Sequence, residues 1–124
     1  MAWVVLPNHY HILATVSDIQ SSLWEFGRLH GRTSFQWNGE DNSRGRKVWH
    51  RCTETAMKSE RHFQATLLYL LHNPVRHSYV ERWRDWPFSN AHQWLEATGE
   101  PRARELWKEF PLGDYGKDWD PPEL

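Results

Sequence analysis

The first sixteen residues constrain the fold more than any other part of the chain. Residues 2–6 and 9–16 are short apolar runs rich in β-forming side chains, and Pro7-Asn8 lies between them. Such runs on either side of a turn dipeptide predict a β-hairpin. A two-stranded hairpin is marginal on its own, so its apolar face needs a helix or further strands from later in the chain.

Two long helices are expected after the hairpin. Ser17-Asp18 provides an N-cap for a helix over residues 19–36, in which apolar side chains recur at helical spacing. Ser59 and Glu60 open a central helix that ends at Asn73, before Pro74. Its apolar side chains gather on the side that should pack on the sheet, namely Phe63, Leu67, Leu70 and Leu71.

The other segments are shorter. Residues 38–46 are rich in Gly, Asn, Ser and charge, which predicts an exposed loop, and the β-formers of residues 47–57 predict a strand. Short helices are expected over residues 89–98 and 101–110. The last stretch, residues 111–124, should lie extended over the domain.

Composition narrows the class of protein. The 124 residues suffice for one domain, and nine Trp with 39% apolar residues favour a folded chain. No apolar run approaches the roughly 20 residues of a membrane span, so we expect a soluble, intracellular protein that does not bind membranes. The single Cys52 excludes an internal disulfide and a multi-cysteine zinc site. Metal chemistry would therefore rest on His, Asn, Gln and carboxylates.

Charge is unevenly distributed along the chain, although the net charge is only -1. Residues 28–84 contain eleven Lys and Arg against five Asp and Glu, whereas residues 85–124 contain four against nine. A basic middle beside an acidic tail suits a surface that binds phosphate. A charge-mixed surface without a partner is the alternative.

His9 and His11 stand one residue apart at the front of the second apolar run. Side chains alternate faces along a strand, so both imidazoles should point to one side and Tyr10 to the other. Two neutral imidazoles can bind one divalent metal ion. The alternative is a half-buried strand with two solvated histidines.

A second polar group lies on the central helix, where one stripe carries His62, Thr66, Tyr69 and Asn73. Together, His9, His11 and Asn73 would offer a metal two nitrogens and one amide oxygen. This incomplete set suits Mg²⁺ or Mn²⁺ acting on phosphate better than a closed zinc site. Tyr69, one helical turn from Asn73, is then the candidate nucleophile. The alternative for Tyr69 is a core-edge residue with its hydroxyl in water.

Two stretches resemble motifs of a known family. Residues 6–13 read Leu-Pro-Asn-His-Tyr-His-Ile-Leu, which is similar to the HUH motif (His, hydrophobe, His) of single-tyrosine transposases. Residues 69–80 read Tyr-Leu-Leu-His-Asn-Pro-Val-Arg-His-Ser-Tyr-Val and resemble the second family motif. The likeness continues through residues 81–89 and 114–117. The nearest group is the REP-associated tyrosine transposases, and the resemblance covers nearly the whole chain.

The resemblance implies an α+β fold: a ferredoxin-like antiparallel sheet that carries the histidine pair, with the tyrosine helix packed nearby. Residues 1–90 would form this domain, and residues 91–124 a helical and extended extension packed on it. Family members normally have several tens of residues before the hairpin, whereas Met1 lies five residues before Leu6. We therefore expect the first strand and helix to be missing, through truncation or a misplaced start. The exposed sheet edge could pair in a homodimer, with a monomer as the alternative.

The resemblance also implies a function. Family members are metal-dependent transposases that cleave and rejoin single-stranded DNA near palindromic hairpin repeats, in the bacterial cytoplasm beside the nucleoid. By position, His9 and His11 match the metal-binding histidines, Asn73 the third ligand of Mg²⁺ or Mn²⁺, and Tyr69 the nucleophile that becomes joined to a 5′-phosphate. Trp49 or Trp83 could stack on bases, or fill the core instead. The basic side chains expected to hold the DNA strand are Arg28, Arg32, Arg46, Lys47, Arg51, Arg61 and Arg76.

Three other functions stay open at this point. The chain could be a decayed or domesticated relative that binds hairpin DNA without cutting it. It could be a small metal-dependent hydrolase that uses His9, His11 and a carboxylate and is indifferent to Tyr69. It could also be a purely structural domain. Metal binding and a covalent DNA adduct separate these possibilities.

Overall fold

The structure is a computed structural model that describes residues 1–120. The chain forms two compact units. One unit comprises Met1–Ala14 together with the chain from Met57 onward, and the other is Thr15–Ala56. The chain contains α-helices and one antiparallel pair of strands, which confirms the expected α+β class.

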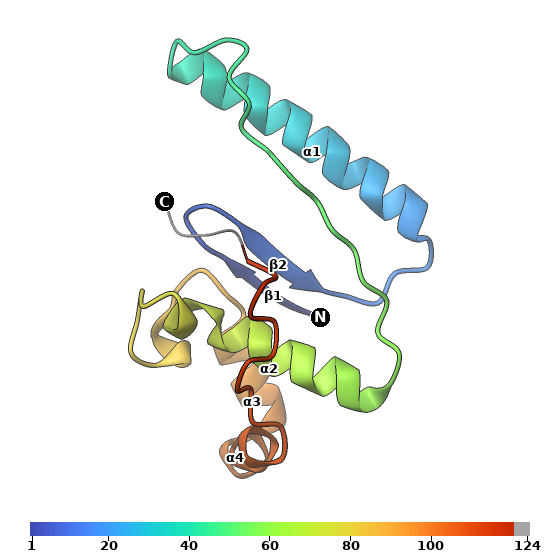
Figure 1. The fold of residues 1–124 in the computed structure, drawn as a ribbon, viewed down its shortest axis with the longest axis vertical. Coiled ribbons are helices and arrows are strands. Elements are labelled where there is room, and N and C mark those ends of the chain that lie inside the picture. Colours follow the sequence, from blue (N-terminus) through green and yellow to red (C-terminus); the bar gives the residue numbers. More distant parts are fainter. Residues whose placement is uncertain (121–124) are drawn as a thin grey trace. The chain divides into compact units, whose positions relative to one another are not determined.

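The hairpin opens the first unit, as expected (Figure 1). Strand β1 (Ala2–Val5) pairs antiparallel with β2 (Tyr10–Leu13), with Val5 opposite Tyr10. The turn closes through a hydrogen bond from the Leu6 amide to the His9 carbonyl (2.8 Å). Residues 88–90 run along the other edge of β1, where the Val5 amide donates to the Phe88 carbonyl (2.8 Å). That edge of the sheet is therefore covered.

Helix α2 (Glu60–Arg76) begins where the sequence predicted and ends later. The Ser59 side chain accepts a hydrogen bond from the His62 amide (3.1 Å) and caps the first turn. The expected end at Asn73 is wrong, because the last turn continues through Pro74. Proline removes one N–H donor and crowds the preceding turn, yet the helix continues to Arg76, and at its C-cap the His77 amide donates to the Asn73 carbonyl (3.1 Å).

The core of the first unit lies between α2 and the hairpin. Leu67, Leu68, Leu70 and Leu71 of α2 are buried there together with Val4, Leu6 and Leu13 of the hairpin. Phe63, expected on the same helical face, is only partly buried at the rim of this cluster. Helix α2 therefore buries Leu67, Leu70 and Leu71, three of the four apolar side chains that its periodicity predicted to face the sheet.

Three short helices complete the first unit: the 3₁₀ turn η1 (Trp83–Asp85), α3 (Ala91–Thr98) and α4 (Glu100–Glu109). Both α-helices were expected from the sequence within a residue or two at each end. The Trp83 ring packs against Trp94 (5.8 Å between ring centroids) and Trp107 (5.6 Å). Trp83 is thus partly buried against the core, in line with the alternative to a role in base stacking.

The second unit consists of α1 (Ile19–Glu40) and the irregular chain that follows it. The Asp18 side chain caps α1, and the helix extends four residues beyond its expected end at Gln36. The strand expected over residues 47–57 is wrong: among residues 1–120 this segment has no strand partner. Trp49 packs on the helix instead and donates through Nε1 to the Thr33 hydroxyl (2.9 Å). Three other β-formers of the segment are exposed, namely Cys52, Thr53 and Thr55.

None of the helices formed by residues 1–120 combines the length and the apolar character that crossing a membrane requires.

Candidate active site

Five polar side chains of the first unit surround the carboxylate of a sixth residue, Asp120. The six residues come from the hairpin, from α2 and its C-cap, and from the segment after α4, namely His9, His11, Tyr69, Asn73, His77 and Asp120. The candidate ligands and nucleophile expected from the sequence are among them. The structure therefore brings together His9, His11, Tyr69 and Asn73, and adds two residues to them.

The histidine pair lies at the start of the second strand. His11 belongs to β2 and His9 immediately precedes it, and the two rings are 5.2 Å apart between centroids. The His9 Nδ1 atom lies 2.6 Å from the Asn8 side-chain oxygen, which can only accept, so Nδ1 carries the proton. Burial and the neighbouring His11 lower the pKa of His9. The Nε2 atom of His9 therefore presents a lone pair to the site.

Tyr69 is buried, with 2% of its surface exposed. Its hydroxyl donates to the Asp120 carboxylate (2.5 Å) and lies 3.4 Å from the Gly116 carbonyl. The alternative of a core-edge tyrosine with its hydroxyl in water is wrong, because the hydroxyl is hydrogen-bonded inside the site. Burial, and then the hydrogen bond to Asp120, raise the pKa of Tyr69 well above its ordinary value.

Asp120 is the residue that sequence reasoning missed. One carboxylate oxygen accepts from His11 (2.7 Å), and the other accepts from Tyr69 and from the Asn73 amide (3.0 Å). Burial would raise the pKa of this carboxyl, but the hydrogen bonds from His11 and Tyr69 outweigh it and hold the pKa below its usual range. Asp120 is therefore a carboxylate at neutral pH.

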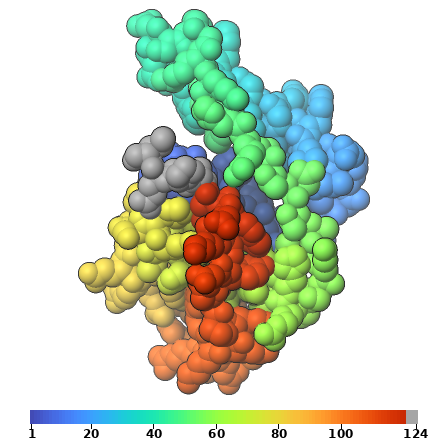
Figure 2. Space-filling view, in the orientation of Figure 1, coloured from blue at the N-terminus to red at the C-terminus, as the bar shows by residue number. Residues whose placement is uncertain are grey.

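Asp120 reaches the site because residues 112–119 fold into successive turns, not the extended stretch expected from the sequence. Arg76 donates to the Tyr115 carbonyl (3.0 Å), and the Thr66 and Tyr115 hydroxyls are hydrogen-bonded (2.8 Å). This segment lies at the surface of its unit (red in Figure 2). The last four residues of the expected extension lie outside the described residues.

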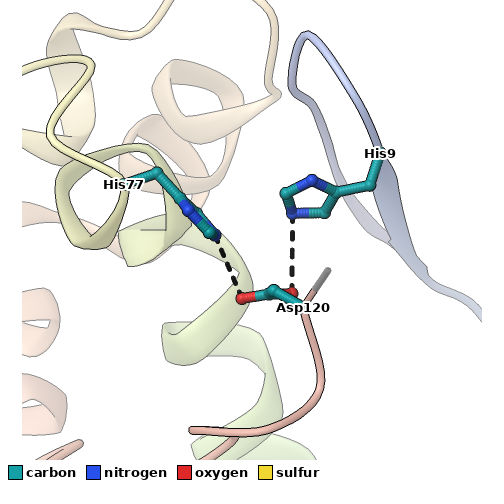
Figure 3. Close-up of side chains that lie close together, drawn as sticks. All are labelled: His9, His77 and Asp120. Atoms are coloured by element: carbon teal, nitrogen blue, oxygen red, sulfur yellow. Dashed lines mark hydrogen bonds and ion pairs between the residues drawn. The ribbon is translucent and has the colours of Figure 1, made fainter. Parts of the chain in front are cut away.

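His77, the C-cap residue of α2, is the second residue missed. Its Nε2 atom lies 3.2 Å from an Asp120 oxygen, and its ring is 5.1 Å from that of His9. Three possible ligand atoms lie within 4.8 Å of one another, one each from His9, His77 and Asp120 (Figure 3). This spacing would allow them to share one metal ion. The sequence held a weak signal, since His77 lies in the same motif as Tyr69.

Two buried acceptor atoms indicate that a cation fits this site. The His9 Nε2 and Asn73 Oδ1 atoms have no hydrogen-bond partner among residues 1–120. His9 Nε2 also faces an Asp120 oxygen at 3.5 Å, and neither atom carries a proton to share. A buried lone pair without a donor is costly, and a divalent ion would satisfy both atoms. Imidazole, amide and carboxylate donors form a ligand set suited to such an ion.

The basic side chains expected to hold DNA divide between the two units. Arg61 lies beside the Phe110 ring (5.4 Å), and Arg76 is committed to the Tyr115 carbonyl and the Tyr69 ring. The other five belong to the second unit: Arg28, Arg32, Arg46, Lys47 and Arg51. Within that unit, Arg28 pairs with Glu25 and Arg46 with Asp41, and both ion pairs are exposed, where such pairs stabilise the fold little. DNA binding by all seven stays a prediction.

Gly116→Ala is expected to destabilise the first unit by about 2 kcal/mol or more, because an added Cβ would lie 2.5 Å from the Tyr69 ring and φ is +71°. Gly113→Ala is the matched control. Gly113 also has a positive φ (+48°), but its added Cβ meets nothing within 4 Å. Urea unfolding of both variants measures the difference, and equal losses of stability would show that the contact with Tyr69 is not tight.

Two curated proteins are similar to this chain. One is the REP-associated tyrosine transposase of Escherichia coli (strain K12), 33% identical over 95 residues that cover 74% of this chain and 53% of the relative. The other, from Haemophilus influenzae, carries a provisional name of the same kind and is 27% identical over 107 residues, covering 78% and 61%. The chain thus spans between half and two thirds of the length of these relatives. No family model and no solved structure matches.

Proposed function

Because the chain belongs to the family of REP-associated tyrosine transposases, we propose that it cleaves and rejoins single-stranded DNA beside palindromic hairpin repeats. Tyr69 is the proposed nucleophile. The observation that carries the proposal is the single buried cluster in which the Tyr69 hydroxyl lies beside His9, His11 and Asn73. A protein with this substrate would work in the bacterial cytoplasm, beside the nucleoid.

In the proposed reaction, the Tyr69 oxygen attacks the scissile phosphate. The bond to the 3′-oxygen breaks, so that strand leaves with a free 3′-OH while the 5′-phosphate stays on the tyrosine. Attack by another 3′-OH on the phosphotyrosine then rejoins two strands and releases the phenol. One phosphate ester replaces another at each step, so no external energy source is needed.

The neighbouring side chains would prepare this chemistry. His9, His11 and Asn73 would hold the divalent ion, Mg²⁺ or Mn²⁺, which when bound supplies Lewis-acid stabilisation of the phosphate charge. Tyr69 must lose its hydroxyl proton as it attacks. That proton is donated in a hydrogen bond to the Asp120 carboxylate. The Tyr69 ring is fixed between Gly116 and the Trp119 ring (5.2 Å between ring centroids), which would keep the nucleophile aligned.

A covalent adduct tests this proposal most simply. The purified chain is incubated with Mn²⁺ and a labelled single-stranded oligonucleotide that contains a palindromic repeat from its own genome. A denaturing gel should then reveal a protease-sensitive band of reduced mobility. A labelled oligonucleotide without the repeat is the control, and we expect much less adduct on it.

A binding protein that no longer cuts DNA is the second candidate function. It is favoured by the state of Tyr69, whose phenol is buried, protonated and bonded to a carboxylate. Such a relative would bind the hairpin oligonucleotide in a mobility-shift assay with Mn²⁺ present and would form no covalent band.

A further inference from the structure

We propose that His77 and Asp120 are ligands of the divalent ion, together with His9. The C-terminal segment would then supply the only carboxylate of the metal centre within residues 1–120. The inference rests on the proposed function and names two members of its metal site that the two family motifs do not assign as ligands. It is carried by the geometry of three side chains and by the Nε2 lone pair of His9, which has no hydrogen-bond partner among residues 1–120.

The three side chains converge from separate parts of the first unit, namely the hairpin turn, the C-cap of α2 and the segment after α4 (Figure 3). The carboxylate bridges the two rings: one oxygen lies 3.5 Å from His9 Nε2 and the other 3.2 Å from His77 Nε2. The side chains are 11%, 10% and 5% exposed for His9, His77 and Asp120, so water competes little for the ion.

The hydrogen bonds of this cluster distinguish His9 from the other two histidines. His11 Nε2 lies 2.7 Å from an Asp120 oxygen, a hydrogen-bond distance at which the ring donates its proton. His77 Nε2 lies 3.2 Å from an Asp120 oxygen and, like His11, donates its proton there, so the ion would replace that proton on binding. His9 Nε2 faces the same carboxylate at 3.5 Å with its lone pair, because its proton is on Nδ1. Two acceptors that face each other without a proton between them are repulsive, and a cation removes that repulsion.

The chemistry of the set agrees with a first-row dication. Two neutral imidazoles and one carboxylate are a recurrent three-ligand set for such ions, and they leave coordination positions open for water or a phosphate oxygen. The Asn73 Oδ1 atom, also buried and without a hydrogen-bond partner among residues 1–120, is available as a further oxygen. The competing explanation is a metal-free network in which Asp120 only accepts hydrogen bonds.

Metal affinity separates these explanations without any use of DNA. Mn²⁺ is titrated calorimetrically into the full chain and into Asp120→Asn and His77→Gln, which keep the size of each side chain. Co²⁺ absorption provides a second readout of the ligands. We expect each variant to bind Mn²⁺ at least about tenfold more weakly and to change the Co²⁺ spectrum.

The matched controls are Asp118→Asn and His92→Gln, which alter exposed residues of the same types. Both should bind Mn²⁺ as the unmodified chain does, and thermal melts show whether every variant folds. Unchanged affinity in Asp120→Asn and His77→Gln, with binding lost in His9→Ala, would overturn the proposal in favour of His9, His11 and Asn73. Absence of Mn²⁺ binding by the unmodified chain would also overturn it, whereas adduct formation by Tyr69 is tested separately on DNA.

Discussion

Tyr69→Phe is expected to abolish covalent adduct formation and strand cleavage while leaving binding of the hairpin oligonucleotide in place. Phenylalanine keeps the ring that packs beside Gly116 and Trp119, but it removes the oxygen that would form the phosphate ester. Loss of a nucleophile leaves no alternative route to the adduct, so the covalent band should fall below detection. Denaturing gels measure the adduct, and mobility shift measures binding.

Tyr79→Phe is the matched control for this experiment. Tyr79 is 40% exposed, so its loss of a hydroxyl should change neither the fold nor the yield of adduct. If Tyr69→Phe still formed adduct at the level of the unmodified chain, the assignment of the nucleophile would be wrong. If both variants and the unmodified chain bound the oligonucleotide without any adduct, the binding protein would be the better description.

Replacing His9 and His11 together by Ala should remove the dependence on Mn²⁺ along with the activity. The two imidazoles lie 5.2 Å apart in the cluster that surrounds Asp120, and their loss deprives the proposed ion of two nitrogen ligands. Metal stabilisation of phosphate charge is worth several kcal/mol, so adduct formation should slow at least a hundredfold. The rate is measured as adduct formed per minute over a Mn²⁺ titration.

The exposed His92 provides the control, because His92→Ala removes an imidazole that lies outside the cluster. That variant should keep the Mn²⁺ dependence of the unmodified chain. A chelator should silence the unmodified chain and His92→Ala alike. Cleavage that persists at full rate in the chelator would contradict a role for any metal ion.

The parts of the fold that the sequence predicted correctly depend on local signals. The hairpin follows from β-formers on either side of Pro7-Asn8, and the start of α2 follows from the capping residue Ser59. Both signals lie within a few residues of the structure they determine. The proximity of His9 to His11 was also local, because alternation along the chain places both rings on one side.

The parts that could not be predicted depend on distant neighbours. Asp120 lies 109 residues from His11, and nothing in its local sequence distinguishes it from Asp118, which is exposed. Residues 47–57 contain β-formers, but β-propensity does not reveal whether a strand edge is free to pair with them, and Trp49 packs on α1 instead. The sequence therefore predicted the site residues that belong to its two motifs, but it did not predict the carboxylate of Asp120.

Mass spectrometry of the trypsin-digested adduct tests the role of Tyr69 most directly. The peptide of residues 62–76, between Arg61 and His77, contains one tyrosine, which is Tyr69. After reaction with the hairpin oligonucleotide and nuclease trimming, this peptide should carry the mass of a 5′-phosphorylated nucleotide fragment on Tyr69. A nucleotide found on another tyrosine, or no modified peptide from a chain that cleaves the DNA, would contradict the proposed phosphotyrosine mechanism.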